Sequence, residues 1–309
     1  MIYSTIEQAR PKAGCYFAAW PICIEKDDPA QKGWTRMDWM ELLKAVILGM
    51  VEGLTEFAPV SSTGHMIIVD DLWLKSTEFL GKYAANTFKV VIQLGSILAA
   101  VVVFKDRFLE LLGIRGRHPG GKPRLTLLHV IIGLLPAGVL GVLFEDYIDE
   151  HLFSTKTVLI GLVLGALLMI VADRFAKKAA RAQTVDQITY KQAFLVGLVQ
   201  CLSLWPGFSR SGSTIAGGVL VGMSHRAAAD FTFIMAVPIM AGASGLSLLK
   251  NWQYVTVADI PFFIAGFLSA FVFALLAIRF FLHLINRIRL VPFAVYRIAL
   301  AFIIYFLYF

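Results

Sequence analysis

The sequence predicts an all-α polytopic membrane protein with six transmembrane helices and two re-entrant helix-turn-helix hairpins, arranged as an inverted-topology repeat. Of its 309 residues, 58% are hydrophobic and only 16% are charged. That composition excludes an ordinary soluble domain. Several apolar runs are long enough to cross about 30 Å of hydrocarbon, which takes about 20 helical residues. Two further apolar segments are interrupted by polar sequence, and the two interruptions are alike.

Six uninterrupted apolar runs are the predicted spans. They cover residues 87–104, 125–144, 157–173, 228–249, 260–284 and 291–309. Residues 1–36 contain no apolar core of about 7–15 residues after a basic start, so they are not a signal peptide. We expect them to be a poorly ordered extension before a single membrane catalytic domain at 37–309, with Met37 or Met40 as its start.

The two interrupted segments are predicted hairpins. They pair residues 41–58 with 62–74, and residues 190–204 with 211–223. Their second halves, of about 13 residues, are too short to cross the membrane. Non-helical backbone at membrane depth is tolerated only where protein or a wet cavity surrounds it, which favours re-entrant hairpins. Four tilted or short spans are the alternative.

The hairpins belong to an internal repeat. A shift of 148 positions lays residues 49–64 over residues 197–212 without a gap. Five pairs are identical: Gly49/Gly197, Val51/Val199, Leu54/Leu202, Ser61/Ser209 and Gly64/Gly212. Three predicted spans separate the copies, so repeat one (41–144) and repeat two (190–284) should point in opposite directions. In inverted repeats with broken helices, the binding site lies near the bilayer midplane at the repeat interface.

Charge in the loops predicts the orientation. The net charge of +7 fits membrane orientation better than a nucleic-acid partner. Basic loops are expected in the cytoplasm and the acidic loop outside. The basic residues are Lys105, Arg107, Arg115, Arg117, Lys122, Arg124, Arg174, Lys177, Lys178, Arg181 and Lys191, and the acidic ones are Glu145, Asp146, Asp149 and Glu150. Both termini then lie outside. The first hairpin opens outward and the second to the cytoplasm, and their tips meet in the membrane.

The first polar motif, EGLTEFAPVSSTGH from Glu52, predicts a cation and nucleophile site. A charge at the bilayer centre costs about 2.5–3.5 kcal/mol on insertion scales, which favours a functional role. Glu52 and Glu56 have i, i+4 spacing, so both carboxylates can share a divalent cation, Mg²⁺ or Ca²⁺. A solvated helix face is the alternative.

The end of this motif predicts an anion site. Ser61, Ser62 or Thr63 can cap the next helix, whose first amides, around Thr63 and Gly64, attract anions. His65 follows Ser62 by three residues, which suits a general acid/base beside a nucleophile. The alternatives are a histidine satisfied by a backbone carbonyl and serines that only cap the helix.

The second polar motif, PGFSRSGST from Pro206, is a phosphate cradle by type. Arg210 offers a planar fork for phosphate oxygens, and the hydroxyls of Ser209, Ser211 and Thr214 can supply further donors. A purely structural pairing of Arg210 with Glu52 or Glu56 is the alternative. Acids in one repeat and an arginine in the other suit phosphoryl transfer better than a symmetric carrier.

Both motifs resemble the signatures of the bacitracin-resistance family of undecaprenyl-diphosphate phosphatases. The resemblance runs from about Met37 to the C-terminus and rests on EGLTEF-x-PVSSTGH and PGFSRSG-x-T, in the same order and spacing. It implies a bacterial inner-membrane enzyme that hydrolyses undecaprenyl diphosphate to undecaprenyl phosphate and inorganic phosphate. This reaction recycles the lipid carrier of cell-wall synthesis and gives bacitracin resistance. It also implies a divalent-cation requirement and an active site that faces outward.

The resemblance also implies residue roles. Glu52 and Glu56 become metal or acid/base residues, Ser62 the nucleophile, His65 its partner and Arg210 the phosphate ligand. The remaining predicted phosphate contacts are Thr63, Gly64, Ser209, Ser211 and Thr214. The expected partners are a polyprenyl diphosphate and membrane lipid, and a homodimer is left open. A lipid flippase, attack by an activated water, and a phosphatase of the acid-phosphatase-like membrane superfamily are alternatives, although the last lacks its Lys-x₆-Arg-Pro signature here.

Overall fold

The computed structural model describes residues 39–114, 124–144, 147–148, 151–152, 154–176 and 180–309. Within these ranges the chain is helical, with one isolated bridge between Ala182 and Met223, so the predicted all-α class is confirmed there. Several predictions fall outside the described residues. They concern the extension 1–36, Met37, Arg115, Arg117, Lys122, Glu145, Asp146, Asp149, Glu150, Lys177 and Lys178.

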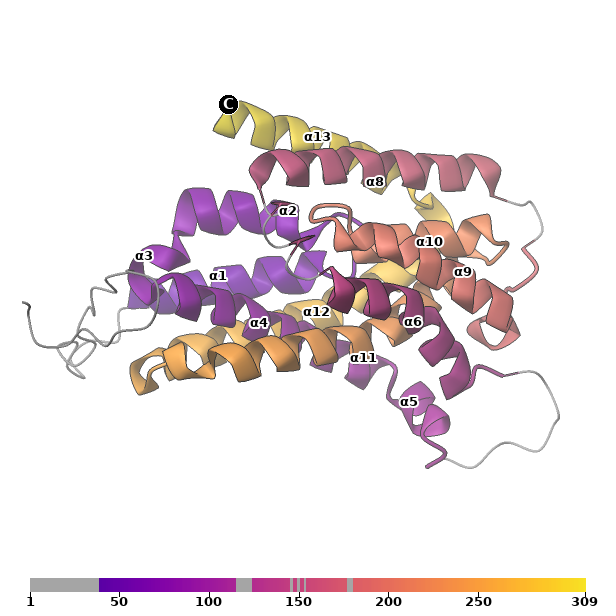
Figure 1. Ribbon diagram of the computed structural model, residues 1–309, viewed down its shortest axis with the longest axis horizontal. Coiled ribbons are helices and arrows are strands. Elements are labelled where there is room, and N and C mark those ends of the chain that lie inside the picture. The colour runs from indigo at the N-terminus through magenta and orange to yellow at the C-terminus, as the bar shows by residue number, and fades with distance from the viewer. Residues whose placement is uncertain (1–38, 115–123, 145–146, 149–150, 153, 177–179) are drawn as a thin grey trace, which may run out of the picture. The chain divides into compact units, whose positions relative to one another are not determined.

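The helices follow the predicted segments (Figure 1). The first hairpin consists of α1 (Trp39–Thr55), α2 (Ser62–Met66) and the π-helix η2 (Ile67–Leu74). After it come α3 (Ser76–Leu80), α4 (Lys82–Val103), α5 (Lys105–Leu111), α6 (Leu127–Leu143), α8 (Thr155–Phe175) and η3 (Val185–Gln187). The second hairpin consists of α9 (Tyr190–Gln200), η4 (Cys201–Leu204) and α10 (Arg210–Leu220). The chain ends with α11 (His225–Asn251), η5 (Trp252–Tyr254), η6 (Val257–Asp259), α12 (Ile260–Ile288) and α13 (Val291–Tyr308).

Five of the described helices are long and apolar enough to cross a membrane. They are α4, α8, α11 with η5, α12 with η6, and α13. The predicted span 125–144 is the apolar helix α6, which has 17 residues. At 1.5 Å per residue it is about 26 Å long, slightly less than the hydrocarbon thickness. The structure thus supports a multi-pass membrane protein.

Each repeat packs its first helix against a helix of the other repeat. On α1, a Cβ added to Gly49 would clash with the carbonyl oxygen of Gly266 on α12. On α9, a Cβ added to Gly197 would clash with the carbonyl oxygen of Gly133 on α6. Gly49 and Gly197 are equivalent positions of the repeat, so the first helix of each repeat packs on the last helix of the other. Glycines at these contacts let the helix backbones approach closely.

Gly49→Ala should therefore lower the melting temperature of the protein in detergent. Forcing a methyl group against backbone costs about 1–3 kcal/mol, which outweighs a helix-propensity gain of up to about 1 kcal/mol. Gly138→Ala on α6 is the matched control, because its Cβ would meet nothing within 4 Å. It should leave the melting temperature unchanged or raise it. Equal melting temperatures for the two variants would contradict the close α1–α12 contact.

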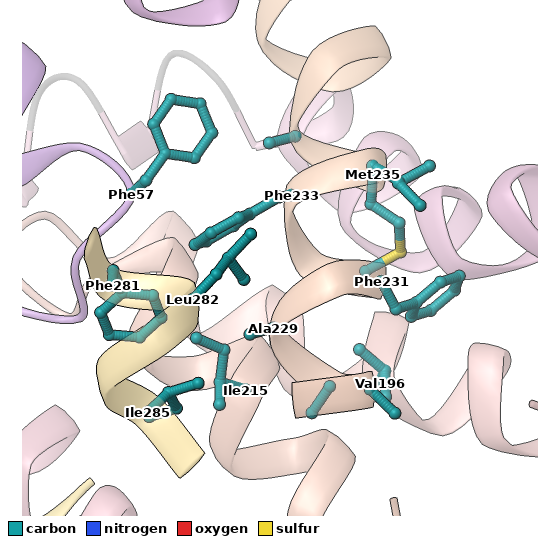
Figure 2. Packing of buried hydrophobic residues seen from close by; sticks show 14 of the residues in the cluster. Phe57, Val196, Ile215, Ala229, Phe231, Phe233, Met235, Phe281, Leu282 and Ile285 are labelled. Atoms are coloured by element: carbon teal, nitrogen blue, oxygen red, sulfur yellow. The ribbon is translucent and has the colours of Figure 1, made fainter. Parts of the chain in front are cut away.

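The core lies directly against the tip of the first hairpin. Phe57, in the turn between α1 and α2, meets Phe233 of α11 edge-on with ring centroids 5.0 Å apart. Phe233 in turn packs against Phe281 of α12. Figure 2 shows these rings together with Ile215 of α10 and Val196 of α9 in the same cluster. Helices of repeat two thereby support the polar turn of repeat one.

Candidate active site

Each hairpin tip is built on a serine in the left-handed region. Ser61 has φ 71° and ψ 99°, and Ser209, its repeat equivalent, has φ 73° and ψ 114°. Each serine hydroxyl accepts a hydrogen bond from the N–H three residues on, at Gly64 and at Gly212. The two tips therefore share one N-capped turn, in agreement with the internal repeat. Of the three predicted capping residues in the first motif, Ser61 is the one that caps α2.

The two tips interlock, as the inverted repeat predicts. Arg210 at the start of α10 donates from Nη2 to Oε1 of Glu56 at 3.0 Å. Its guanidinium lies 5.6 Å from the centroid of the Phe57 ring. The Ser211 hydroxyl donates to the carbonyl oxygen of Ala58 at 3.0 Å. The structural pairing of Arg210 with an acid is thus present, with Glu56 as the acid.

Glu56 joins the serine to the arginine. The Ser62 hydroxyl donates to Glu56 Oε2 at 2.7 Å, while Oε1 accepts from Arg210. The expectation that His65 pairs with Ser62 differs from the structure. His65 Nδ1 donates to the carbonyl oxygen of Ser61 at 2.8 Å, and Nε2 pairs with the Tyr296 hydroxyl at 2.7 Å. Both ring nitrogens are therefore engaged elsewhere, and the Ser62 hydroxyl is hydrogen-bonded to Glu56 instead.

Two buried polar atoms of the site lack hydrogen-bond partners among the described residues. Glu52 is 5% exposed, and its Oε1 has no partner. Arg210 Nη1 is buried and has none either. The backbone N–H of Glu56 donates to the carbonyl oxygen of Glu52 at 2.9 Å, so the two carboxyl groups lie one helical turn apart on the same face. Two carboxyl groups this close repel each other unless a proton or a cation lies between them. These atoms mark a site with capacity for both a cation and an anion.

The carboxylate pair fits a cation that is shared with a phosphorylated ligand. No group of three or more His, Cys, Asp or Glu side chains in the described part of the chain could hold a metal alone. Mg²⁺, however, is commonly bound through one or two carboxylates together with substrate phosphate oxygens and water. Glu52, with its unpartnered oxygen, and Glu56 match that ligand set.

Some predicted phosphate contacts serve the turn instead. Thr214 is fully buried, and its hydroxyl donates to the carbonyl oxygen of Arg210 and accepts from Thr232. The Ser211 hydroxyl is used on Ala58 and lies 3.2 Å from that of Ser209. The structure therefore brings Glu52, Glu56, Ser62 and Arg210 together but does not add the Thr214 hydroxyl. Thr63 lies in the first turn of α2, and Gly64 there packs against Leu162 and Leu300.

Sequence reasoning missed two neighbours on α13. Tyr296 contacts His65, as given above. Arg297 is fully buried, and its Nη2 donates to the carbonyl oxygens of Gly207 and Phe208 at 3.0 and 2.8 Å. A lone arginine within the apolar run 291–309 was the available signal. It is the same signal that identified Arg210.

The chain has clear relatives. Residues 45–303 match the family described as bacitracin resistance protein BacA. A protein of Geobacillus kaustophilus (strain HTA426) named undecaprenyl-diphosphatase is 92% identical over 273 residues, which are 88% of this chain and 100% of the relative. A Staphylococcus aureus (strain Newman) protein of the same name is 62% identical over 280 residues, covering 87% of this chain and 96% of the relative.

Proposed function

The chain belongs to the bacitracin resistance protein BacA family, and we propose that it hydrolyses undecaprenyl diphosphate to undecaprenyl phosphate and inorganic phosphate. The activity is that of relatives up to 92% identical that are named undecaprenyl-diphosphatase. The structural support for this proposal is a pair of hydrogen bonds to one carboxylate. Ser62 donates to Glu56 at 2.7 Å, and Arg210 donates to Glu56 at 3.0 Å. These hydrogen bonds join a nucleophile, a proton acceptor and an anion ligand in one partly buried cluster.

In the proposed mechanism, Ser62 Oγ attacks the terminal phosphorus and gives its proton to Glu56. The bond between that phosphorus and the bridging oxygen breaks, and undecaprenyl phosphate leaves. Glu56 passes this proton to the departing undecaprenyl phosphate. Water then attacks the phosphoserine and gives a proton to Glu56 while the bond between phosphorus and Ser62 Oγ breaks. Oγ takes that proton back from Glu56, and inorganic phosphate leaves. Arg210 stabilises the equatorial oxygens with its guanidinium. The Arg210–Glu56 ion pair found here is exchanged for a contact with phosphate as the substrate enters.

A divalent cation, Mg²⁺ or Ca²⁺, is part of this proposal, and Glu52 and Glu56 would hold it. When bound, it would neutralise charge on the diphosphate oxygens. Glu52→Gln should raise the cation concentration needed for half-maximal activity, because it removes one ligand charge with little change in volume. Glu78→Gln, at an exposed residue of α3, is the control and should leave the cation dependence unchanged. An unchanged dependence in Glu52→Gln would assign Glu52 to proton transfer or to structure.

The function is tested by phosphate release from purified protein in detergent. With a C55 diphosphate and divalent cation, sustained release is expected, and EDTA should abolish it. Detergent removes any membrane gradient, so an enzyme continues to turn over there. A flippase without hydrolytic activity would release no phosphate, and that result would overturn the proposal.

The proposed arrangement in the inner membrane has six spans, with α6 as the sixth, and two re-entrant hairpins. Three facts support it: the five long apolar helices, the 17-residue apolar helix α6, and the interlocked tips that join the two repeats. The active site faces the periplasm or exterior, both termini lie outside, and the polyprenyl diphosphate enters from the surrounding lipid. A homodimer remains open.

Cysteine labelling tests this orientation. In a variant with Cys15, Cys23 and Cys201 replaced by serine, Glu78→Cys should react with a membrane-impermeant maleimide in intact cells. Arg181→Cys should react only after lysis. Both native side chains are exposed in the structure, so the difference reports the side of the membrane. Labelling of Arg181→Cys in intact cells would contradict the orientation.

A further inference from the structure

Helix α13 reaches both strained turns through two consecutive residues. Tyr296 pairs with His65, and His65 donates to the carbonyl oxygen of Ser61, the left-handed residue of the first tip. Arg297 donates to the carbonyl oxygens of Gly207 and Phe208. These two carbonyls immediately precede Ser209, the left-handed residue of the second tip. The Tyr296–Arg297 dipeptide is thereby linked to the backbone of both hairpin tips, through His65 at the first tip and directly at the second.

The contacts with Ser61 and Tyr296 together favour one tautomer of His65. The carbonyl oxygen of Ser61 can only accept, so Nδ1 of His65 carries hydrogen. In the neutral imidazole the other nitrogen, Nε2, is then an acceptor, and the Tyr296 hydroxyl donates to it. The rings also stack, with centroids 5.6 Å apart and an interplanar angle of 13°. The Ser61 carbonyl thus sets the tautomer of His65, while Tyr296 supports that tautomer by donating to Nε2 and holds the plane of the ring.

The carbonyl of Ser61, which is hydrogen-bonded to His65, determines the orientation of the Ser62 side chain. A non-glycine residue in a sparsely populated backbone region costs about 1–3 kcal/mol and persists only where its surroundings fix it. The carbonyl of Ser61 belongs to the peptide unit that links Ser61 to Ser62. Its hydrogen bond to His65 fixes that peptide plane and, with it, the direction from which the Ser62 hydroxyl meets Glu56.

The lack of a side chain at Gly165 of α8 leaves room for the contact between Arg297 and the second tip. A Cβ added to Gly165 of α8 would clash with Arg297 Nη2 and with the carbonyl oxygen of Phe208. Arg297 also donates to the carbonyl oxygen of Gly161 on α8 at 3.3 Å. The Arg297 guanidinium thus lies between α8 and the second tip. It is fully buried there and hydrogen-bonds the backbone of the turn.

We propose that Tyr296 and Arg297 are positioning residues that hold the two seryl turns in the geometry needed for phosphoryl transfer, Tyr296 through His65 and Arg297 directly. The proposal rests on the proposed function. It adds that His65 serves the reaction by fixing the Ser61–Ser62 peptide, and that α13 is the element that fixes both turns.

Tyr296→Phe is the principal test, because it removes one hydroxyl and keeps the ring. The kcat for phosphate release should fall about 10-fold, the upper range for loss of one hydrogen bond, while KM stays within about 2-fold. Tyr305→Phe on the same helix is the matched control. Tyr305 is 53% exposed, and its described ring contacts are edge-on with Phe306 and tilted with Phe309, near the C-terminus. The kcat of Tyr305→Phe should therefore equal that of the wild type.

The tautomer of His65 gives a second readout. In protein labelled with ¹⁵N-histidine at mildly alkaline pH, the wild type should show His65 with hydrogen on Nδ1, assigned by its absence in His65→Gln. Tyr296→Phe should increase the fraction with hydrogen on Nε2, and Tyr305→Phe should not. A wild-type kcat in Tyr296→Phe, or a reduced kcat with an unchanged His65 tautomer, would overturn the proposal. The NMR result does not require hydrolysis, so it separates failure of this inference from failure of the proposed function.

Arg297→Lys tests the contact between Arg297 and the carbonyls of Gly207 and Phe208. A single ammonium group cannot reproduce a planar guanidinium that bonds two neighbouring carbonyls, so kcat should fall even where the melting temperature shows a folded protein. Full activity in a folded Arg297→Lys variant would remove Arg297 from the proposal.

Discussion

Ser62→Ala should reduce phosphate release by about 10³-fold or more, the scale of losses when a nucleophile is removed. The Ser62 hydroxyl is the one that donates to Glu56 at 2.7 Å. The neighbouring Ser61 hydroxyl caps α2 by accepting from Gly64. With Ser62 as nucleophile, rapid acid quench of the wild type during turnover should trap a phosphoserine at this position.

Ser61→Ala is the control for this prediction. It should keep substantial activity with a lower melting temperature, because losing a helix cap costs about 0.5–2 kcal/mol. A folded Ser62→Ala enzyme that turns over well, together with a wild type that yields no phosphoserine, would favour direct attack by water. Ser62 would then be a phosphate ligand.

Arg210→Lys should lower kcat about 10²–10³-fold, the loss typical for removal of an oxyanion donor. In the structure one guanidinium nitrogen, Nη2, bonds Glu56 while the other, Nη1, is buried without a described partner. A guanidinium can place two donors on one phosphate, whereas an ammonium acts as a point charge. The measurement is steady-state phosphate release at saturating cation.

The control for this substitution is Arg279→Lys, at an exposed position of α12, which should behave as wild type. Near wild-type hydrolysis by Arg210→Lys would show that Arg210 supplies only positive charge. The mechanism would then contain no bidentate contact between Arg210 and phosphate.

The location of the site could be predicted from the sequence, because charged residues in apolar segments are costly and Glu52, Glu56 and Arg210 stand out there. The internal repeat, whose copies are offset by 148 positions, likewise predicted equivalent turns at Ser61 and Ser209. These two serines share one backbone conformation. Both predictions depend on local composition and spacing, which the sequence displays directly.

The hydrogen bonds within the site could not be predicted in the same way. Helical spacing placed His65 beside Ser62, but the ring instead bonds the carbonyl of Ser61 and the hydroxyl of Tyr296, 231 residues away. That contact depends on how α13 packs. Thr214 was expected at the phosphate, yet it lies four residues after Arg210 on a helix. Its hydroxyl bonds back to that residue's carbonyl, as threonines within helices often do.

The packing of each repeat's first helix against the other repeat has a consequence for biogenesis. During synthesis, α1 leaves the ribosome carrying Glu52, but its glycine contact on α12 is made with Gly266, about 200 residues further along the chain. At about 5–20 residues per second, translation alone delays that contact by about 10–40 s. For most of this interval the nascent first hairpin lacks Arg210 opposite Glu56, and for all of it the hairpin lacks its packing partner on α12. We therefore expect the acidic hairpin to enter the bilayer late, after the ribosome has completed α12.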